Sequence, residues 1–389
     1  MTPHFIPSPR RFFTALSVLL AAAACGGDVL DDTVAATAGS GGANSADASS
    51  SSGSDTIPDG ISVKDADVGN YYDDLPDYAN LPWIEEWQLE AEITGPLGDE
   101  QKAGAIRGAI EVVEYQGTLY LYVADLGGVR VFTSKDGLSW DNAASTAHVP
   151  VGGDDSQLIY THPYAAVDPD GKLHMFMQTK DPSLDKGRFF ISHTTSSDGL
   201  SFDEPESFLN CSEVLADYDC TSCAHGRITS LPSGGYAIAF SATCQQQNYP
   251  KGLSKSFVPG TMMAYSNDLV SWQIDPAAFF PACHDPAFDL SEGKVYLYCA
   301  SEVDLLPGGT AFDDKAAQLL RFDSDDGRSW TPKDPAGIVR FSDSNGEQIP
   351  RDEWMLADVD VHDFGDGTVR MYTPASAGDY PSVFTFTRK

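Results

Sequence analysis

The stretch SDDGRSW, residues 324–330, decides the fold because the chain contains four versions of it. The other versions are SKDGLSW at 134–140, SSDGLSF at 196–202 and SNDLVSW at 266–272. Successive copies begin at residues 134, 196, 266 and 324, which are 62, 70 and 58 residues apart. A period of this size indicates repeated supersecondary units.

Each repeat also contains apolar alternating runs around a turn glycine, such as YQGTLYLYVA at 115–124 and SEGKVYLYCA at 291–300. A fifth run of this kind, GDGTVRMYTPA, stands at 365–375. Short alternating runs separated by turn residues are typical of strands and hairpins. Four-stranded units repeated about an axis are propeller blades. The sequence therefore predicts an all-β fold, a five-bladed β-propeller of four-stranded antiparallel blades.

The repeated motif itself is expected to be structural. Its Asp–Gly pair makes the tight turn between the third and fourth strands, because glycine tolerates positive φ. Its last aromatic residue should anchor the outer strand against a neighbouring blade. The five predicted units contain only four copies of the motif, so the outer strand of the fifth unit must come from elsewhere in the chain. Residues 85–93, EEWQLEAEI, resemble VSWQIDPAAFF at 270–280, assigned here to the fourth blade, and are predicted to close the ring.

The amino-terminal segment reads as an export signal. Arg10 and Arg11 precede the apolar run FFTALSVLLAAAA, which is too short to span a bilayer. AAAC at 22–25 resembles a bacterial lipobox, which predicts a lipoprotein signal peptide over 1–24 and lipidation of Cys25. An ordinary secretory signal ending near a cysteine is the alternative. Residues 25–62 are rich in Gly, Ser, Ala and Asp and predict a flexible tether. Residues 63–389 form the predicted propeller domain.

The composition restricts the partners. The formal net charge is −33 at pH 7, and no basic stripe is present. Such a surface repels nucleic acid and anionic lipid, so nucleic-acid binding is excluded. The expected location is the bacterial cell envelope, with attachment by the lipid alone. Because no Asp follows Cys25, the outer membrane or cell surface is favoured. The protein is expected to be a monomer.

Six cysteines follow Cys25, and an even number in an exported chain indicates disulfides. Cys283 begins one predicted inner strand and Cys299 ends the adjacent antiparallel strand. Cys223 and Cys244 hold the matching positions one blade earlier. The predicted bridges are Cys283–Cys299, Cys223–Cys244 and, from the remaining pair, Cys211–Cys220.

Ionisable residues stand where the inner strands begin. Five repeats thus place Arg, His or Asp at one level around one axis, where a polar pocket is plausible. These residues are Arg107, His162, His225 with Arg227, His284 with Asp285, and Asp358 with Asp360. The other interpretation is that these groups only satisfy one another and plug the channel.

Phrases such as HDPAFDLSEGKVYLY and YSNDLVSW resemble the five-bladed glycosidases of the arabinanase, β-xylosidase and invertase group. The Ser-x-Asp-Gly turns are similar to the Asp-boxes of sialidases. The resemblance covers about 85–389 and implies a glycoside hydrolase-like fold acting on carbohydrate. The family's catalytic carboxylates come from its first three blades. At the matching positions this chain has Arg107, His162 and His225, so the usual carboxylates are absent.

Three hypotheses follow for the function. The first is a glycosidase that uses Asp285 with Asp358 or Asp360, aided by His225 or His284. Asp358 and Asp360, two apart on a strand, should face one side. An inverting mechanism needs carboxyl groups about 6.5–9.5 Å apart.

The second hypothesis is a protein that binds glycans without cleaving them. Arg107 and Arg227 would grip an acidic sugar, because guanidinium groups suit carboxylate or sulfate. The predicted substrate-binding residues, in either of the first two cases, are Arg107, His162, Arg227, His284 and Glu302.

The third hypothesis is an axial metal site formed by His162, His225, His284 and Asp358. This ligand set suits zinc or a similar ion, and the family resemblance implies calcium. No cofactor is required by the first two hypotheses, and a divalent metal is compatible with either.

Overall fold

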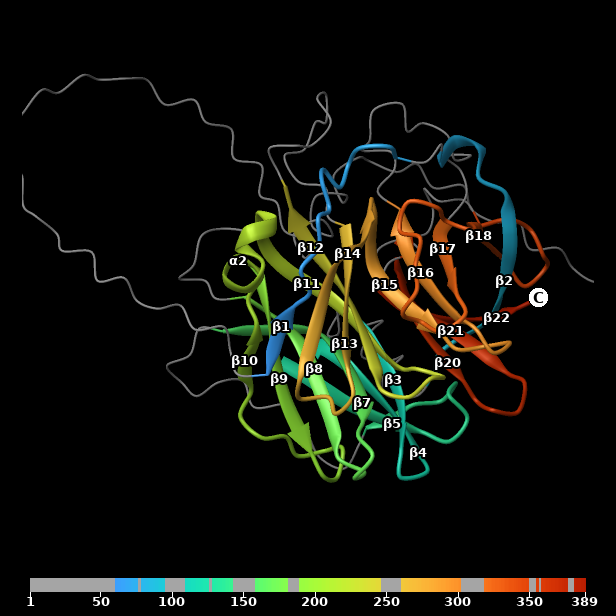
Figure 1. The fold of residues 1–389 in the computed structure, drawn as a ribbon. Helices are drawn as coiled ribbons and strands as arrows, with labels where there is room; N and C mark the ends of the chain where they lie inside the picture. Colours follow the sequence, from blue (N-terminus) through green and yellow to red (C-terminus); the bar gives the residue numbers. More distant parts are fainter. Residues whose placement is uncertain are drawn as a thin grey trace, which may run out of the picture. The chain divides into compact units, whose positions relative to one another are not determined.

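The computed structural model consists almost entirely of β-strands (Figure 1). The residues it describes are 60–75, 78–94, 109–125, 128–142, 158–180, 189–245, 260–301, 318–349, 355–356, 358–376 and 381–389. The chain divides into two units, Met1–Ser54 and Asp55–Lys389, and all described residues belong to the second. Within these residues, no helix has the length and apolar character needed to cross a membrane.

The first two sheets are four-stranded antiparallel meanders, as predicted. The first comprises β3 (Ile110–Tyr115), β4 (Thr118–Asp125), β5 (Gly128–Ser134) and β6 (Asp141–Asn142). The second comprises β7 (Ile159–Val167), β8 (Leu173–Lys180), β9 (Phe189–Ser196) and β10 (Glu206–Leu209).

The third sheet has five strands rather than four. Its meander is β11 (Cys220–Ser230), β12 (Tyr236–Cys244), β13 (Gly260–Ser266) and β14 (Trp272–Pro281). The short β1 (Ile61–Val63), whose first two residues fall within the predicted tether, pairs in parallel with β14. Residues 270–280 belong to this sheet, because the third turn motif joins β13 to β14, and their assignment to the fourth blade was wrong.

The remaining strands form one nine-stranded sheet. It contains β15 (Cys283–Asp289), β16 (Val295–Ser301), β17 (Gln318–Ser324), β18 (Gly337–Ser342), β2 (Trp83–Glu92), β22 (Pro381–Arg388), β21 (Val369–Ser376), β20 (Asp360–Asp363) and β19 (Met355–Leu356). As predicted, the amino-terminal β2 pairs antiparallel with the carboxy-terminal β22. Its other edge pairs in parallel with β18, which joins two predicted blades.

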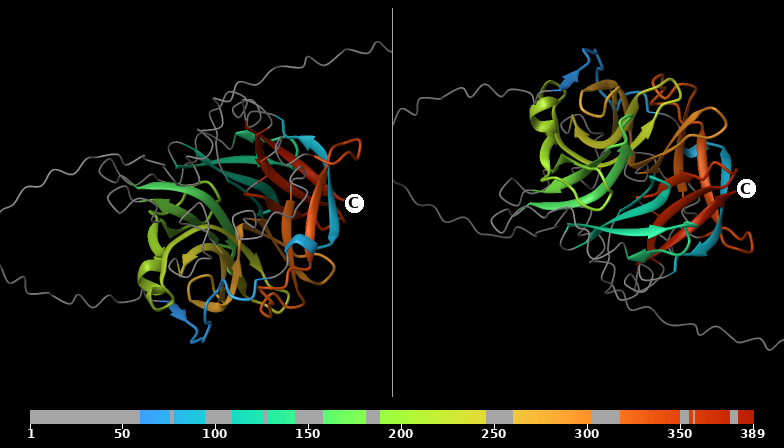
Figure 2. Two further views of the ribbon diagram at one scale, coloured as in Figure 1. Left: turned by 90° about the horizontal axis from the view of Figure 1, so that it is seen from above. Right: turned by 90° about the horizontal axis from the view of Figure 1, so that it is seen from below.

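The first strands of the five repeats form a closed ring. β3 contacts β7, β7 contacts β11, β11 contacts β15, β15 contacts β20, and β20 contacts β3. The sheets extend outward from this ring, as the views along and against its axis show (Figure 2). The residues that begin these strands are therefore brought to one central region.

The four repeated turns have the predicted structural role. In the fourth, the Ser324 hydroxyl accepts the amides of Asp326 and Gly327, and Asp326 Oδ1 accepts those of Arg328 and Ser329. Each closing aromatic ring packs against the preceding sheet in the ring, with centroids 5.6–6.2 Å apart. The pairs are Trp140–Tyr372, Phe202–Tyr122, Trp272–Phe176 and Trp330–Phe280. These contacts hold consecutive sheets together.

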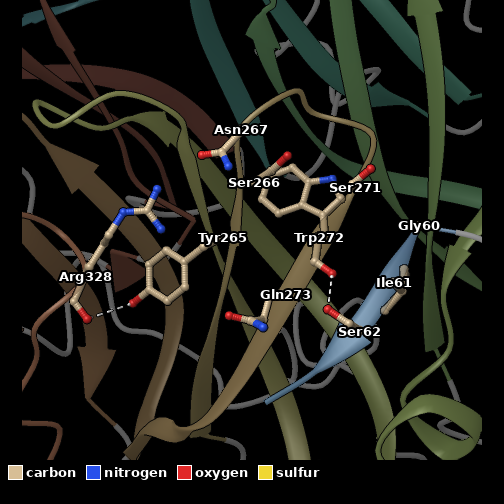
Figure 3. Close-up of a pocket in the computed structure, with 10 residues that line it drawn as sticks. All are labelled: Gly60, Ile61, Ser62, Tyr265, Ser266, Asn267, Ser271, Trp272, Gln273 and Arg328. Atoms are coloured by element: carbon tan, nitrogen blue, oxygen red, sulfur yellow. Dashed lines mark hydrogen bonds between the residues drawn. The ribbon is translucent and has the colours of Figure 1, made fainter.

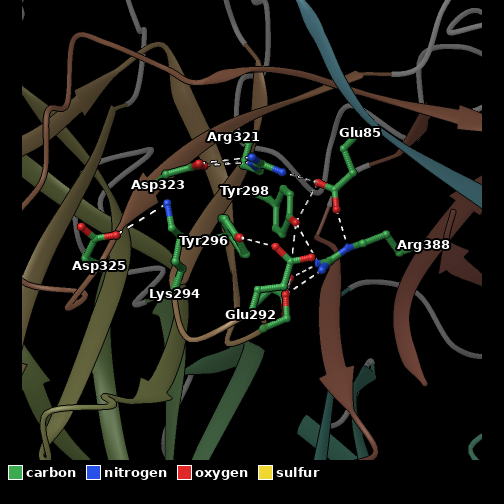
Figure 4. Close-up of polar contacts among 11 residues, drawn as sticks. Glu85, Glu292, Lys294, Tyr296, Tyr298, Arg321, Asp323, Asp325 and Arg388 are labelled. Carbon is green, nitrogen blue, oxygen red and sulfur yellow. Dashed lines mark hydrogen bonds and ion pairs between the residues drawn. The ribbon is translucent and has the colours of Figure 1, made fainter. Parts of the chain in front are cut away.

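A largely buried ionic network supports the place where β2 meets β22 (Figure 4). Glu85 of β2 lies 2.5 Å from Arg388 of β22 and 3.2 Å from Arg321 of β17. Arg388 also pairs with the fully buried side chain of Asp289 on β15. Charged side chains are buried in proteins when they are paired in this way.

The structure contains three disulfides, and two differ from the predicted pairs. Cys283–Cys299 is present as predicted. Cys220, rather than Cys223, bonds Cys244, because the antiparallel register sets Cys220 opposite Cys244 and Cys223 opposite Ala242. Cys223 therefore bonds Cys211 at the start of the short helix α2 (Cys211–Val214).

Candidate functional site

The first strands of the ring share an unusual backbone feature at the predicted site residues. The pairing register shifts at His162 in β7, at His225 in β11 and next to His284 in β15. Each shift contains a residue with positive φ, and a fourth such residue precedes β20. They are His162 (φ 48°), His225 (φ 30°), Asp285 (φ 49°) and Asp358 (φ 52°).

His and Asp are among the side chains that tolerate this left-handed conformation best. A bulge re-aims a side chain out of the regular alternation of a strand. Four residues with positive φ, three of them at register shifts, therefore bring four ionisable side chains from four repeats to one region. Such clustered backbone strain is typical of functional sites.

His225 is the centre of the resulting His–Asp cluster, which comprises His162, His225, His284, Asp285 and Asp358. Its Nδ1 atom lies 2.6 Å from Asp285 Oδ1 and 3.2 Å from Asp358 Oδ1. The His162 ring lies 3.9 Å and the His284 ring 4.4 Å from the His225 ring, centroid to centroid. The cluster thus brings together five of the predicted residues.

The two outer histidines each contact one carboxylate. His162 Nε2 lies 3.5 Å from Asp358 Oδ1, and His284 Nδ1 lies 2.9 Å from Asp285 Oδ1. The contacts of Asp285 Oδ1 lack hydrogen-bond geometry, so this buried oxygen accepts no hydrogen bond from the described residues. His162 Nδ1 is likewise buried without a partner there.

Burial and mutual contact change the protonation of the cluster. Burial opposes a charge on His225, but the carboxylates of Asp285 and Asp358 outweigh it and raise the pKa of His225 to about 10. Burial would raise the pKa of Asp358, but the imidazoles of His162 and His225 hold it well below its ordinary value. The pKa of Asp285 is also lowered, since His284 and His225 outweigh burial and the charge of Asp358.

This protonation pattern bears on the glycosidase hypothesis. Neither carboxyl group of the cluster retains a proton near neutral pH, so neither is a carboxylic acid that could protonate a leaving group. Their nearest oxygens both contact His225 Nδ1, at 2.6 and 3.2 Å, which does not favour a carboxyl separation of about 6.5–9.5 Å. This arrangement does not favour the predicted inverting pair of Asp285 and Asp358, which stays a prediction.

Asp360 lies in a second layer of charged residues next to the cluster. The prediction that Asp358 and Asp360 face the same side was wrong, because Asp358 has positive φ and β20 starts only at Asp360. Asp360 Oδ2 accepts the amide of Val112, and burial raises the pKa of Asp360. Its contacts are those of a structural group and not of a catalytic one.

Arg227 belongs to this second layer as well, and its contacts do not support the predicted substrate-binding role. Only 3% of Arg227 is exposed, and its guanidinium donates to four backbone carbonyls. The acceptors are Val359, Gly226, Ile110 and Asp358. The carboxylates of Glu111 and Asp360 lie 3.7 and 3.9 Å from its Nε.

Three predicted positions lie outside the described residues: Arg107, Glu302 and the lipidation site Cys25. Sequence reasoning missed Glu111 and Gln178, which contact the site region from β3 and β8. Each is a polar residue that directly follows an apolar one in its strand, in IEVVEY and LHMFMQTK, and this was the signal that could have identified them. Gln178 accepts the amide of His225 at 3.1 Å.

The cluster could hold a cation. His162, His225 and Asp358 each offer one ligand atom within 4.8 Å of the others, and His225, His284 and Asp285 do the same. Imidazole nitrogen with carboxylate oxygen is a ligand set that suits zinc and similar transition metals.

Two surface hollows lie elsewhere and contain none of the predicted site residues. One, of about 450 Å³, is lined by residues of β1, β13, β14 and the third turn, with Arg328 from the fourth (Figure 3). The other, of about 600 Å³, lies between the turns after β15 and β20 and includes Arg388 and Lys389. Both are open to solvent rather than enclosed. Neither is lined by a group of histidines and aspartates like that of the cluster.

The ring of sheets has the fold of the β-propeller glycoside hydrolases. A thermostable family-43 glycoside hydrolase matches with a TM-score of 0.51 and 16% identity, covering 76% of this chain and 92% of its own. The GH43_1 enzyme from Xanthomonas citri complexed with xylose matches at 0.51 and 13%, covering 76% and 89%. An endo-arabinase from Bacteroides thetaiotaomicron matches at 0.51 and 10%, covering 77% and 97%.

At these identities the likeness establishes the fold alone. The sequence matches no family model and no curated protein. The resemblance predicted from the repeated phrases is confirmed at the level of architecture. The chemistry must be argued from the cluster.

Proposed function

We propose that this chain is a five-bladed propeller that acts on carbohydrate at a divalent metal centre formed by the His–Asp cluster. In this interpretation the nine-stranded sheet is two blades joined by the β18–β2 pair. The observation that carries the proposal is the convergence of three histidines and two aspartates from the first strands of four repeats, at or beside residues with positive φ.

The residues fit a metal ion on two grounds. Asp285 Oδ1 lies close to two imidazole nitrogens, yet in a geometry unsuited to hydrogen bonding, which is expected where lone pairs point at a shared ion. The two buried carboxylates carry two negative charges, of which a protonated His225 balances one when no ion is bound, and a divalent cation would balance both. Three imidazoles favour a transition metal such as zinc over calcium.

When bound, a zinc-like ion would supply a Lewis acid that can also lower the pKa of a bound water. The chain's own residues would hold it, with Asp285 and Asp358 as anionic ligands and the histidines as neutral ones. The structural relatives include glycoside hydrolases, one of them complexed with xylose and one an endo-arabinase. Cleavage of a glycosidic bond in a poly- or oligosaccharide is therefore the first candidate reaction.

Binding of a glycan without cleavage is the second candidate. It is favoured by the absence, within the cluster, of a carboxyl group whose pKa is raised enough to act as an acid. A metal ion and imidazoles could then orient sugar hydroxyl or carboxylate groups without chemistry.

The test begins with metal analysis of the purified full chain. We expect about one zinc-like ion per chain. Asp358→Asn and His162→Gln should each weaken zinc binding by more than the roughly 10–100-fold typical of outer-shell changes. His193→Gln, which alters a partly buried histidine outside the cluster, is the matched control. A chain that contains no metal and binds neither added Zn²⁺, Co²⁺ nor Ca²⁺ would refute the metal centre.

A glycan panel then separates the two candidates. Sugar release that requires metal and disappears in Asp358→Asn supports cleavage. Retention on a glycan array without release supports binding. Neither release nor retention on a broad panel, acidic sugars included, would remove carbohydrate from the proposal.

The export route belongs to the same proposal. Residues 1–24 would be cleaved as a lipoprotein signal, Cys25 would carry the lipid, and residues 25–62 would tether the domain to the outer membrane. Radiolabelled palmitate should label the wild type and leave Cys25→Ser unlabelled. Equal labelling of both would contradict this arrangement.

A further inference from the structure

Next to the cluster, the side chains of one arginine and one glutamine form hydrogen bonds with the backbone around the residues that have positive φ. We propose that Arg227 and Gln178 are positioning residues that keep His225 and Asp358 in the left-handed conformation required to face the ligand. This inference rests on the proposed function, because it concerns how the metal ligands are held. A guanidinium near an axial site suggests that its partner is an anionic group of the substrate. In this inference the partner of Arg227 is instead the protein backbone.

The hydrogen bonds of Arg227 end beside the bulges. Its Nη1 donates to the Gly226 carbonyl at 2.9 Å, directly after His225. Its Nη2 donates to the carbonyl of Asp358 at 3.0 Å and to that of Ile110 at 3.0 Å. Its Nε donates to the Val359 carbonyl at 3.2 Å. One side chain thus joins β11, the first residue of β3 and the two residues just before β20.

Lysine could not replace these contacts. A guanidinium offers five donors in a fixed plane, whereas an ammonium offers three donors from one atom. The four carbonyls lie on three different segments of chain, so a single ammonium nitrogen cannot reach them all.

Two carboxylates balance the buried charge of Arg227 and extend the same support. Glu111 Oε1 accepts the amide of Ala165 on β7 at 3.0 Å. Asp360 Oδ2 accepts the amide of Val112 on β3 at 2.7 Å. Side-chain to backbone hydrogen bonds therefore link four neighbouring first strands immediately beside the cluster.

Gln178 supports His225 from the neighbouring sheet. The register shift removes the His225 amide from the ladder with β12, and a buried amide needs another acceptor. Gln178 Oε1 on β8 provides it at 3.1 Å, and the residue is only 2% exposed. Arg227 and Gln178 thus hold the His225 bulge from its two sides.

The experiment compares Arg227→Lys, Gln178→Met and the control Arg328→Lys in the purified full chain. Arg328 is an exposed arginine on the fourth turn motif, away from the cluster. Co²⁺ is titrated while its visible absorption spectrum is recorded. We expect both positioning variants to bind Co²⁺ about 10–100-fold more weakly, with an altered spectrum, as outer-shell changes do. The control should match the wild type.

Hydrogen exchange of the peptide around 220–230, measured without metal, provides a second readout. Faster exchange at the His225 amide in Gln178→Met supports the inference, and wild-type exchange overturns it. If Arg227→Lys does not fold, Gln178→Met decides. If the wild type binds no Co²⁺, the metal proposal fails. The hydrogen exchange of the His225 amide then decides by itself whether Gln178 and Arg227 are positioning residues. Wild-type Co²⁺ affinity and spectrum in both folded variants would overturn the inference.

Discussion

At the residue scale, the repeated turn tolerates one exception to its glycine. Leu269 has φ 63° at the position where Gly137, Gly199 and Gly327 have φ 70–74°. Its side chain is fully buried, so packing outweighs the unfavourable backbone conformation.

Leu269→Gly should therefore destabilise the protein although it relieves the backbone. Relieving the strain of a left-handed leucine should raise the free energy of unfolding by about 1–2 kcal/mol. Emptying a buried leucine site should lower it by about 2–5 kcal/mol. Denaturant unfolding should show a net loss of about 2 kcal/mol. Equal or greater stability of the variant would mean that the leucine contributes little packing.

A histidine pair outside the cluster should make stability depend on pH. His193 Nε2 lies 3.0 Å from His174 Nδ1, and His174 Nε2 lies 3.2 Å from Asp168. Burial, together with the neighbouring His174 and Lys172, lowers the pKa of His193 from 6.5 to about 4.

Because His193 stays neutral in the folded state, the unfolded chain takes up the extra proton as the pH falls. Stability should be complete above about pH 6.5, decline toward pH 4 and then level off. In His193→Gln this part of the decline should disappear when melting temperature is followed against pH. Parallel curves for the two proteins would show that His193 does not titrate as described.

At the element scale, the disulfides fix how α2 meets the third sheet. The Cys211–Cys223 bridge ties the helix to β11, and Cys220–Cys244 ties β11 to β12. Non-reducing digestion with mass spectrometry should recover these two linkages. Recovery of Cys211 bonded to Cys220 would contradict the structure.

Replacing Cys211 and Cys223 together by serine should cost about 3 kcal/mol, as expected for a bridge across a loop of this length. Thermal unfolding of the oxidised proteins measures it. Cys223 stands only two residues before His225 on β11, so metal binding of the folded variant also tests whether the bridge between α2 and β11 supports the site. Weaker metal binding by this folded double variant than by the wild type would show that α2 supports the site.

At the scale of the whole molecule, the ring depends on β2 joining the carboxy-terminal strand. Arg388→Met would leave the buried carboxylates of Glu85 and Asp289 without their shared partner. Breaking a buried pair in this way costs about 3–5 kcal/mol.

Arg340→Met is the matched control, because Arg340 pairs with Glu86 at 2.6 Å but its side chain is 42% exposed. An exposed pair contributes about 0–1 kcal/mol. The two variants should therefore differ clearly in denaturant midpoint. Equal, small losses would indicate that ring closure does not depend on the buried network.

The sequence by itself determined the repeat, the strands and the closing strand. Alternation and turn residues are local properties, so 115–124 and 324–330 predict their structure without knowledge of their neighbours. The Cys283–Cys299 bridge followed from strand position for the same reason. The candidate residues at the strand starts could likewise be selected before any coordinates.

Only the tertiary structure decided which of those residues meet and what they do. The left-handed conformations of His225 and Asp358 occur where Gln178 of β8 and Arg227 of β11 hydrogen-bond to their backbone. The register of β11 against β12 decided that Cys220, and not Cys223, faces Cys244. Register and bulges are set by packing between distant segments, which no local pattern encodes.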